Sequence, residues 1–311
     1  MKDMEIIREK RTAGPVVAVL GTFDGVHRGH QELISRGKRL AEQLNARLRV
    51  VTFDRHPMEV ICPGRAPKVL QTAEEQAEIM ERLGVDELRI FSFTPEMAAT
   101  EPEDFLRLLR EECDLKAAAA GWNYTFGRMG RGNAEMLRAD AEKHGYGVLI
   151  VPPVRSAAGE VISSTAIRGK LLEGDLEGAN DMLGYPYGIS GQVVSGKHEG
   201  TRIGYPTANI RPEGRKLLPA YGVYACRLEC EGKRRAGVLN IGLQPTIPSG
   251  EVTVEVHVLH EEIDLYGKRA AVRLIKFLRP ERRFSSIAGL TEQIGRDQRE
   301  AEAMEETLLR E

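Results

Sequence analysis

With 311 residues, the chain is long enough to form two domains that each bury a core, and its hydrophobic fraction of 41% is ordinary for a globular protein. Lys and Arg number 44 against 46 Asp and Glu, so the net charge of -2 gives no reason to expect nucleic acid or an anionic membrane surface as a partner. A small-molecule substrate fits this balance better.

The first residues and the cysteines both favour the cytoplasm. The chain starts MKDME, with charges where a signal peptide needs an apolar core, and no apolar run approaches the ~20 residues that span a bilayer. Cys62, Cys113, Cys226 and Cys230 contain no CxxC pair. If Cys226 and Cys230 share a strand, they lie roughly 13 Å apart, too far for a disulfide. We therefore expect reduced thiols and no zinc site.

Residues 16–151 alternate short apolar strands with helical stretches. We expect strands at 16–20, 48–53, 88–93, 117–120 and 148–151, and helices at 30–44, 73–83, 102–112 and 134–144. Thr72 with Glu75, and Thr100 with Glu103, fit the capping box at a helix start. This alternation predicts an α/β fold with a doubly wound parallel sheet, whose ligands bind beyond the carboxyl ends of the strands.

The pattern changes near Gly184, where we place a boundary between domains 1–184 and 185–311. A helical segment from Ser164 to about Leu183 ends there, at Gly184-Tyr185-Pro186. Beyond it we expect strand pairs, 221–229 with 235–240 around Glu231-Gly232, and 252–260 with 269–278 around Tyr266-Gly267. These pairs indicate a small antiparallel β-barrel, which a helix over about 285–309 follows.

The most informative motif, LGTFDGVHRGH at 20–30, directly follows the first strand of this alternation. Gly21, Gly25 and Gly29 let the backbone turn and approach a ligand at the start of a helix, where N–H groups attract phosphate. His27 and His30 are three residues apart and share a helix face. If protonated, both rings would stabilise charge that develops on a phosphoryl group. Surface histidines or a metal pair are the alternatives, but a third metal ligand is not evident.

Two further stretches offer ligand groups. ISSTAIR at 162–168 places the hydroxyls of Ser163, Ser164 and Thr165 at a helix N-terminus, with Arg168 one turn later. Alone, this pattern is usually just an N-cap. Asn123 in GWNYTFG has an amide that can hydrogen-bond a ribose or a phosphate, or it simply forms a turn.

The single tryptophan and one histidine are weaker candidates. We expect Trp122 to pack in the fold rather than to stack on a cofactor. His56 stands before Pro57 in TFDRHP and is a possible ligand contact.

The second half carries GKHEGTRIGYPTAN at 196–209. Glycines 196, 200 and 204 form a lip that can fold over phosphates. Thr207 and Asn209 present oxygens on the same side of an extended segment, which suits a hydrated Mg²⁺.

The strand around Glu255 alternates with a period of two. Val252, Val254, Val256 and Val258 face one way, and Thr253, Glu255 and His257 face the other. On this pattern alone, Glu255 is a solvated residue of the outer face. Asn240-Ile241-Gly242 and Asp264-Leu265-Tyr266-Gly267 read as barrel turns.

Together these motifs resemble the bacterial family of bifunctional riboflavin kinases and FMN adenylyltransferases. GTFDGVHRGH is similar to the nucleotidyltransferase signature, and TFDRHP, GWNYTFG and ISSTAIR are similar to motifs of bacterial FAD synthetases. The loop ending in PTAN and the VEVH strand are similar to riboflavin kinase motifs. The resemblance covers nearly the whole chain.

For the first domain, the resemblance implies adenylylation of FMN by ATP, which yields FAD and pyrophosphate. His27 and His30 would stabilise the α-phosphate transition state, while Arg168 and the hydroxyls of Ser164 and Thr165 would hold the triphosphate. It further implies nucleotide or flavin contacts by Gly21, Phe23, Asp24, Gly25, Gly29, His56, Asn123 and Ser163.

For the second domain, the resemblance implies phosphorylation of riboflavin to FMN by Mg-ATP. Glu255 would be the general base for the flavin 5′-hydroxyl, and Thr207 with Asn209 would bind Mg²⁺. It implies further contacts by Gly196, Gly200, Arg202, Gly204, Pro206 and Asn240. The chain departs from the family at Thr201-Arg202, since the family usually has Arg directly after the glycine that matches Gly200.

Two other functions stay open at the level of the sequence. A cytidylyltransferase that makes a CDP-alcohol would explain the motifs of the first half but not the barrel. A flavin-binding regulatory module without turnover would keep the scaffold. We expect riboflavin, FMN and ATP as small-molecule partners, with no nucleic acid and no membrane, and the oligomeric state is not predicted.

Overall fold

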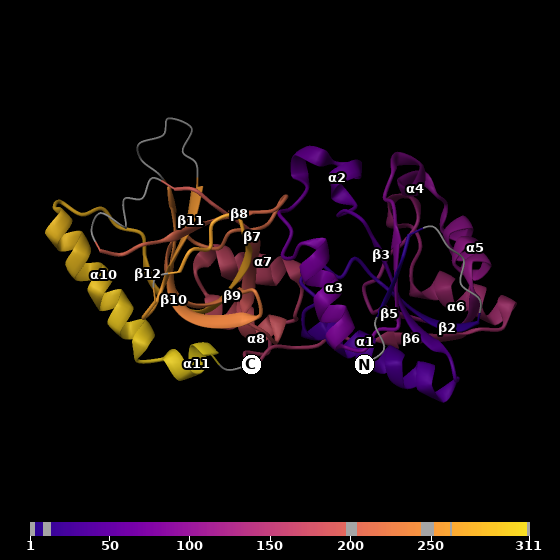
Figure 1. Cartoon of the computed structure of the whole chain (residues 1–311). Helices are drawn as coiled ribbons and strands as arrows, with labels where there is room; N and C mark the ends of the chain where they lie inside the picture. The colour runs from indigo at the N-terminus through magenta and orange to yellow at the C-terminus, as the bar shows by residue number, and fades with distance from the viewer. Residues whose placement is uncertain (1–3, 9–13, 197–203, 244–251, 262, 310–311) are drawn as a thin grey trace. The chain divides into compact units, whose positions relative to one another are not determined.

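The computed structural model (Figure 1) describes residues 4–8, 14–196, 204–243, 252–261 and 263–309. The chain forms two compact units, 1–164 and 165–311. Within the described residues, no helix combines the length and the apolarity needed to cross a membrane.

A parallel sheet forms the centre of the first unit, as the alternation predicted. Its strands are β1 (Glu5–Ile7), β2 (Pro15–Leu20), β3 (Arg47–Phe53), β4 (Glu87–Phe91), β5 (Asp114–Gly121) and β6 (Gly147–Val151). Their order is β1-β4-β3-β2-β5-β6. The chain therefore adds β3 and β4 on one side of β2 and then β5 and β6 on the other, so that the strand order reverses between β2 and β5. In doubly wound sheets this reversal opens a crevice at the carboxyl ends of the two strands. The edge strand β1 was not predicted.

Helices cover both faces of this sheet (Figure 1). They are α1 (Arg28–Gln43) and α3 (Ala73–Arg82) on one face, and α5 (Pro102–Glu112) and α6 (Ala134–His144) on the other. Phe105 of α5 and Leu137 of α6 belong to one buried cluster with Leu20 of β2. On the opposite face α1 lies so close to β2 that a Cβ at Gly37 would collide with Val19. Four short helices lie in the connections: α2 (Met58–Ile61), η1 (Pro63–Arg65), α4 (Pro95–Ala99) and η2 (Arg128–Gly130).

One of the two predicted capping boxes forms. The Thr72 hydroxyl accepts a hydrogen bond from the Glu75 N–H at 3.2 Å, and the Glu75 carboxylate accepts one from the Thr72 N–H at 3.0 Å. The box at Thr100 and Glu103 is wrong, because Glu101 is the N-cap of α5. Pro102 takes the first helical position, where its fixed φ suits the helix and no N–H is lost. Thr100 instead ends α4, and its hydroxyl donates to the Glu96 carbonyl.

The second unit contains the predicted closed barrel of antiparallel strands. They are β7 (Tyr187–Val194), β8 (Ala208–Pro212), β9 (Gly222–Cys230), β10 (Lys233–Leu243), β11 (Val252–Val258) and β12 (Arg269–Pro280), in the order β10-β11-β8-β7-β12-β9. The turn at Glu231-Gly232 joins β9 to β10 with positive φ at both residues, as in a tight hairpin. The predicted pairing of 252–260 with 269–278 is wrong. The Gly267 N–H donates to the Val193 carbonyl, so the chain enters β12 beside β7 rather than beside β11.

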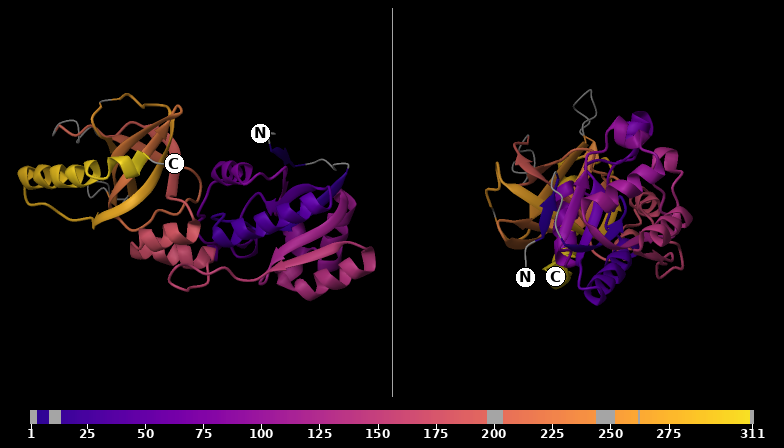
Figure 2. Two further views of the ribbon diagram at one scale, coloured as in Figure 1. Left: turned by 90° about the horizontal axis from the view of Figure 1, so that it is seen from below. Right: turned by 90° about the vertical axis from the view of Figure 1, so that its right-hand side faces the viewer.

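In the described part of the second unit, four helices accompany the barrel: α7 (Ser164–Glu173), α8 (Leu176–Leu183), α10 (Ile287–Glu302) and α11 (Glu305–Leu309). The predicted single helix over 164–183 is broken, because Gly174 has a φ of 84° and Asp175 caps α8. The predicted terminal helix is likewise two helices. Both α10 and α11 pack on the outside of β9 and β10, where Ala301 and Leu308 meet Ala225 and Ala236 (Figure 2).

The side chain of Asn180 links helix α8 to the barrel. Asn180 donates to the Leu274 carbonyl at 3.0 Å and accepts from the Tyr187 N–H at 2.8 Å. The compact second unit therefore includes α8, although the strand pattern starts only after Gly184.

Candidate functional site

The histidine motif forms a strained turn at the point where the sheet reverses. Residues 21–27 connect β2 to α1, and Phe23 and Val26 have φ values of 53° and 26°. Residues with side chains, β-branched ones above all, rarely adopt this region. The side chain of Gln76 on α3 holds the turn by donating to the carbonyls of Thr22 at 3.2 Å and Phe23 at 3.0 Å. Neighbouring elements thus fix an energetically unfavourable backbone at the expected ligand crevice.

The two histidines of this turn stack on each other. His27 is the N-cap of α1, and its Nδ1 accepts a hydrogen bond from the His30 N–H at 3.3 Å. The ring centroids lie 3.7 Å apart with 13° between the planes. Since Nδ1 of His27 is an acceptor, the neutral ring carries its proton on Nε2. The buried Nδ1 of His30 has no hydrogen-bond partner among the residues that the structure describes.

Burial controls the charge of both rings. It lowers the pKa of His27 from 6.5 to about 4, and the pKa of His30 falls well below 6.5 through burial and the neighbouring His27. Both imidazoles are therefore neutral at pH 7 without ligand. Neutral rings still donate hydrogen bonds, and the negative charge of a bound phosphate would raise both pKa values.

Three residues of the motif that were predicted to contact a ligand have structural roles: Phe23, Asp24 and Gly29. The Asp24 carboxylate accepts a hydrogen bond from the Leu70 N–H at 2.8 Å, and the Asp24 carbonyl accepts one from the Ser164 hydroxyl at 2.7 Å. Phe23 is fully buried, with its ring 5.1 Å from that of His30. A Cβ at Gly29 would lie 3.1 Å from the His27 ring, so glycine leaves room for that ring. These residues shape the turn, and ligand contacts by Phe23, Asp24 and Ser164 stay a prediction.

The segment after β5 lies across the reversal point from the histidine turn. Asn123 is exposed there, in a turn that the Tyr124 N–H closes on the Gly121 carbonyl at 3.0 Å. The Trp122 side chain is 53% exposed, so the expectation that it packs in the fold is wrong. Trp122 lies in the segment that leaves the sheet after β5, so its ring does not pack into the hydrophobic core. The exposed amide of Asn123 can reach a ligand in the crevice.

A cavity at the end of β3 brings His56 to the same edge of the sheet. Thr22, Asp54, His56 and Gln76 are among the residues that line it. The His56 Nδ1 accepts a hydrogen bond from the Met58 N–H at 3.2 Å. Burial alone would raise the pKa of Asp54, but hydrogen bonds from the Phe93 N–H and the Arg55 side chain lower it, so a carboxylate faces this cavity.

The predicted triphosphate-binding residues lie at the start of α7. Ser163 precedes the helix and is half-buried, Thr165 is exposed, and Arg168 is half-buried one turn later. Arg168 belongs to the second compact unit, and its predicted role is not tested by the fold of either unit.

In the barrel, three predicted site residues form one row across neighbouring strands. Glu255 on β11 pairs in register with Asn209 on β8 and with Asn240 on β10. Directly opposed residues share a face of an antiparallel pair, so the carboxylate has an amide side chain on either side. All three are half-buried. The prediction that Asn240 lies in a turn is wrong, because it lies within β10.

This row lies on the outer face of the barrel. Glu255 alternates with the buried Val254 and Val256, as the period of two predicted. Asn240 shares its face with Val238, which packs against the cluster under α10 and α11. Glu255 is therefore on the outer face but not fully solvated.

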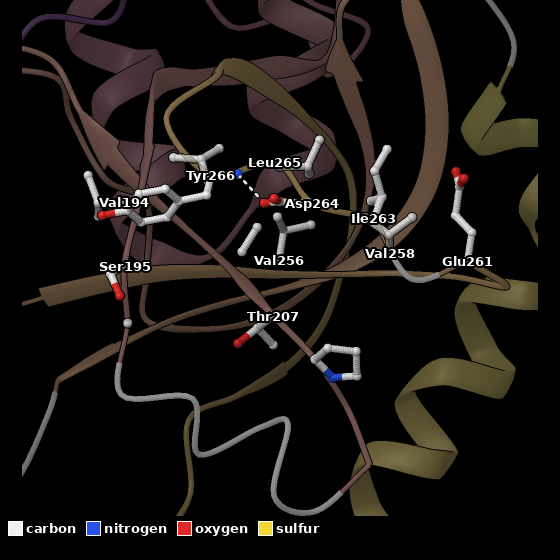
Figure 3. Close-up of a pocket in the computed structure, with 14 residues that line it drawn as sticks. Val194, Ser195, Thr207, Val256, Val258, Glu261, Ile263, Asp264, Leu265 and Tyr266 are labelled. Atoms are coloured by element: carbon white, nitrogen blue, oxygen red, sulfur yellow. Dashed lines mark hydrogen bonds between the residues drawn. The ribbon is translucent and has the colours of Figure 1, made fainter.

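A second barrel feature is a largely apolar pocket whose lining includes hydroxyl groups (Figure 3). Thr207 and Ser195 lie on one side of it, opposite Leu265 and Tyr266. Its lining also includes Val193, Gly196, Pro206, Ala208, Val256 and Val258. Apolar walls with a few polar groups are typical of small-molecule sites.

The glycines of the PTAN loop have different outcomes. Gly196 lines the pocket and lies against Asn209, because a Cβ there would collide with the Asn209 amide. Gly204 is exposed, with a φ of 84°. Gly200, Thr201 and Arg202 lie outside the described residues. The predicted turn at 264–267 is confirmed, since the Tyr266 N–H donates to the Asp264 carboxylate at 2.9 Å.

The oxygen donors around Asn209 suit magnesium. Thr207 supplies a hydroxyl, Asn209 an amide oxygen and Glu255 a carboxylate within a few residues of two paired strands. The described part of the chain contains no group of three or more His, Cys, Asp or Glu that could hold a metal ion. Mg²⁺ is usually bound by one or two protein ligands together with phosphates and water. The donor set therefore fits Mg²⁺ that arrives with a nucleotide.

Two residues near this row were not identified as site residues from the sequence. The Nδ1 of His257 lies 2.8 Å from the Pro206 carbonyl. The Glu281 carboxylate lies where a Cβ of Gly242 would be, beside Asn240. The alternation did place His257 on the face of Glu255, whereas no sequence pattern connects Glu281 to β10.

Comparison with known proteins matches each unit to a separate family model. The FAD synthetase model matches residues 9–166, and the riboflavin kinase model matches residues 183–305. A bifunctional riboflavin kinase/FMN adenylyltransferase of Listeria monocytogenes is 37% identical over 289 residues, which is 92% of this chain and 91% of that protein. The chain belongs to this bifunctional family. The resemblance in the sequence motifs is thereby confirmed.

Other members of the family match over similar lengths. The Bacillus subtilis protein is 35% identical over 300 residues, or 95% of this chain and 94% of its own length. A crystal structure from Streptococcus pneumoniae, described as a macrolide-efflux protein, has a TM-score of 0.87 and 30% identity, and covers 96% of this chain and 99% of its own. The two-unit architecture is thus found in a solved structure over nearly the full length.

Proposed function

We propose that this chain makes FAD from riboflavin in two ATP-dependent steps. The barrel unit phosphorylates riboflavin to FMN, and the first unit adenylylates FMN. The observation that carries this proposal is the row Asn209–Glu255–Asn240 in one unit and the stacked His27–His30 pair in the other. Each set of groups suits one phosphoryl chemistry, and each lies in the unit that matches the corresponding family model.

In the kinase step, Glu255 accepts the proton of the flavin 5′-hydroxyl. The oxygen then attacks the γ-phosphorus of ATP, the bond to the β-phosphate oxygen breaks, and ADP leaves. Asn209 and Asn240 flank the carboxylate on the same face of the sheet. The apolar pocket takes the nucleoside of ATP, which leaves the phosphates beside the hydroxyl groups of Ser195 and Thr207 in its lining. Bound Mg²⁺ would neutralise phosphate charge, with Thr207 and Asn209 as its protein ligands.

In the adenylylation step, a phosphate oxygen of FMN attacks the α-phosphorus of ATP and pyrophosphate leaves. Positioning and charge stabilisation suffice, because the attacking phosphate needs no general base. The neutral His27 donates a hydrogen bond from Nε2 to a phosphate oxygen. The buried Nδ1 of His30, which has no partner among the described residues, gains a hydrogen-bond partner when phosphate is bound. Asn123 contacts FMN, and triphosphate binding by Thr165 and Arg168 stays a prediction from the sequence.

We further propose a functional domain boundary near Gly184 and a cytoplasmic location. The riboflavin kinase match begins at residue 183, next to that glycine. The balanced charge and the ATP requirement of both steps support the cytoplasm.

The test is a pair of variants with opposite defects. We expect His30→Ala to lower FAD formation from FMN by roughly 100-fold or more, since it removes a group that stabilises the transition state. FMN formation from riboflavin should stay within about twofold, which also serves as the control for folding. Glu255→Ala should do the reverse. Products are separated by chromatography after incubation with ATP, Mg²⁺ and either riboflavin or FMN.

The unmodified protein separates this proposal from its alternatives. FMN without any FAD would remove the assignment of the first unit, and tight FMN binding without ATP consumption would indicate a regulatory module. A product formed from CTP and an alcohol would indicate a cytidylyltransferase. Loss of both activities in either folded variant would contradict two independent sites.

A further inference from the structure

We propose that His257 is a positioning residue for the riboflavin kinase step, through a hydrogen bond that fixes the Pro206-Thr207 peptide against the strand of Glu255. The inference rests on the proposed kinase function. It concerns a residue that does not touch the reacting atoms. Its Nδ1 lies 2.8 Å from the Pro206 carbonyl oxygen. A carbonyl can only accept, so the neutral ring must carry its proton on Nδ1.

This hydrogen bond lies just beyond the last backbone pair of β8 and β11. Strand β8 pairs with β11 through Glu255–Asn209 and Val256–Ala208, and the described ladder ends there. Pro206 and Thr207 precede β8 and have no ladder pair with β11 in the described residues. His257 is the next residue of β11 after this ladder. Its side chain therefore connects β11 to a segment that the sheet itself does not hold.

The geometry of proline makes this single contact effective. The φ of Pro206 is fixed by its ring, and the peptide that joins it to Thr207 is planar. A hydrogen bond to the Pro206 carbonyl therefore fixes the plane of that peptide. The N–Cα bond of Thr207 lies in this plane, so its direction is fixed as well. Thr207 lines the pocket on the same side as Ser195 (Figure 3). The proposed Mg²⁺ ligand is thus oriented from the strand that carries the proposed base.

The ring of His257 is itself held in place. It is half-buried, and the Tyr205 ring meets it edge-on, with centroids 5.5 Å apart and 74° between the planes. The Tyr205 hydroxyl lies against α10, 3.4 Å from where a Cβ of Gly295 would be. Tyr205 on one side and the Pro206 carbonyl on the other therefore restrict the rotation of the His257 ring before substrate binds. Such preorganisation lowers the cost of positioning a ligand.

The experiment compares asparagine and glutamine at position 257, because their side-chain amides extend to different distances from the backbone. The amide nitrogen of asparagine comes close to the position of Nδ1, whereas that of glutamine comes close to Nε2. We expect His257→Gln to raise the Mg²⁺ concentration for half-maximal riboflavin phosphorylation about tenfold, the change that corresponds to about 1.4 kcal/mol for one lost hydrogen bond. His257→Asn keeps the donor and should stay within about threefold. Adenylylation of FMN by the same full-length chain should be unchanged in both variants.

The outcomes distinguish this inference from the function on which it depends. If the unmodified protein forms no FMN, the proposed function is wrong. If it forms FMN and the Asn and Gln variants behave alike, whether both active or both impaired, the positioning role of Nδ1 is wrong. His257→Phe removes the donor and keeps an aromatic ring beside Tyr205. It should match the Gln variant, and Phe behaviour like that of the unmodified protein would overturn the proposal.

Discussion

At the residue scale, the buried histidine pair should make the first unit sensitive to acid. The pKa of His27 is lowered from 6.5 to about 4, so between these values the unfolded chain binds a proton that the folded chain does not. The free energy of unfolding must therefore fall as the pH is lowered through this window. Urea unfolding at pH 7.5 and pH 5, followed by the fluorescence of Trp122, should show the fall in stability, because this only tryptophan lies in the first unit.

The matched variant for this prediction is His27→Asn. Asparagine is a favourable N-cap and can still accept from the N–H groups of α1, but it does not titrate in this range. We expect a smaller loss of stability between pH 7.5 and pH 5 than in the unmodified protein, with His30 responsible for what remains. An equal loss in both proteins would show that His27 is not the group that responds.

At the element scale, the start of α3 supports the histidine turn from a distance. The capping box of Thr72 fixes this helix one turn before Gln76, which holds the turn carbonyls. We expect Thr72→Ala to lower the free energy of unfolding by about 1 kcal/mol, the usual value of a lost N-cap. Urea unfolding measures it. Thr72→Ser keeps the hydroxyl and should recover most of the loss, so a serine variant as unstable as the alanine one would contradict the role of the cap.

Local patterns in the sequence predicted most elements but not how they pair. The boundaries of α5 and α6 follow from Pro102, Asn133 and the Gly145 that ends α6, since these act within one helical turn. The pairing of β12 with β7 and β9 depends on contacts between segments far apart in the sequence, which a hairpin pattern cannot represent. For the same reason Asn240 was placed in a turn, although it lies opposite Glu255 within the sheet.

The site was predictable where chemistry and spacing coincide within a few residues. His27 and His30 are three apart on one helix end, and their stacking follows from that spacing. Their neutral state did not follow, because it depends on burial by elements that the motif does not contain. Trp122 was expected to pack in the fold, yet the backbone carries it out of the sheet and leaves it 53% exposed. Burial, unlike spacing, is a property of the whole unit.

At the scale of the whole molecule, the two proposed sites share no residue, so two defective chains should complement each other. The His30→Ala chain alone should convert riboflavin only to FMN, and the Glu255→Ala chain alone should leave riboflavin unchanged. A mixture of both should produce FAD after a lag, because FMN released by one chain is substrate for the other. Chromatography over time measures this. A mixture that accumulates FMN and never forms FAD, while Glu255→Ala still uses added FMN, would show that released FMN does not reach the second chain.

The closure of the barrel by β12 has a consequence for how the molecule is made. The parallel sheet has all its strands once synthesis has passed Val151, whereas β12, which pairs with both β7 and β9, begins only at Arg269. Pairing between the first and last strands of the barrel closes a long loop, which is slow and cannot start before β12 has left the ribosome. The adenylylating half of the chain can therefore acquire its fold during translation, while the barrel of the kinase half cannot close until synthesis is nearly finished.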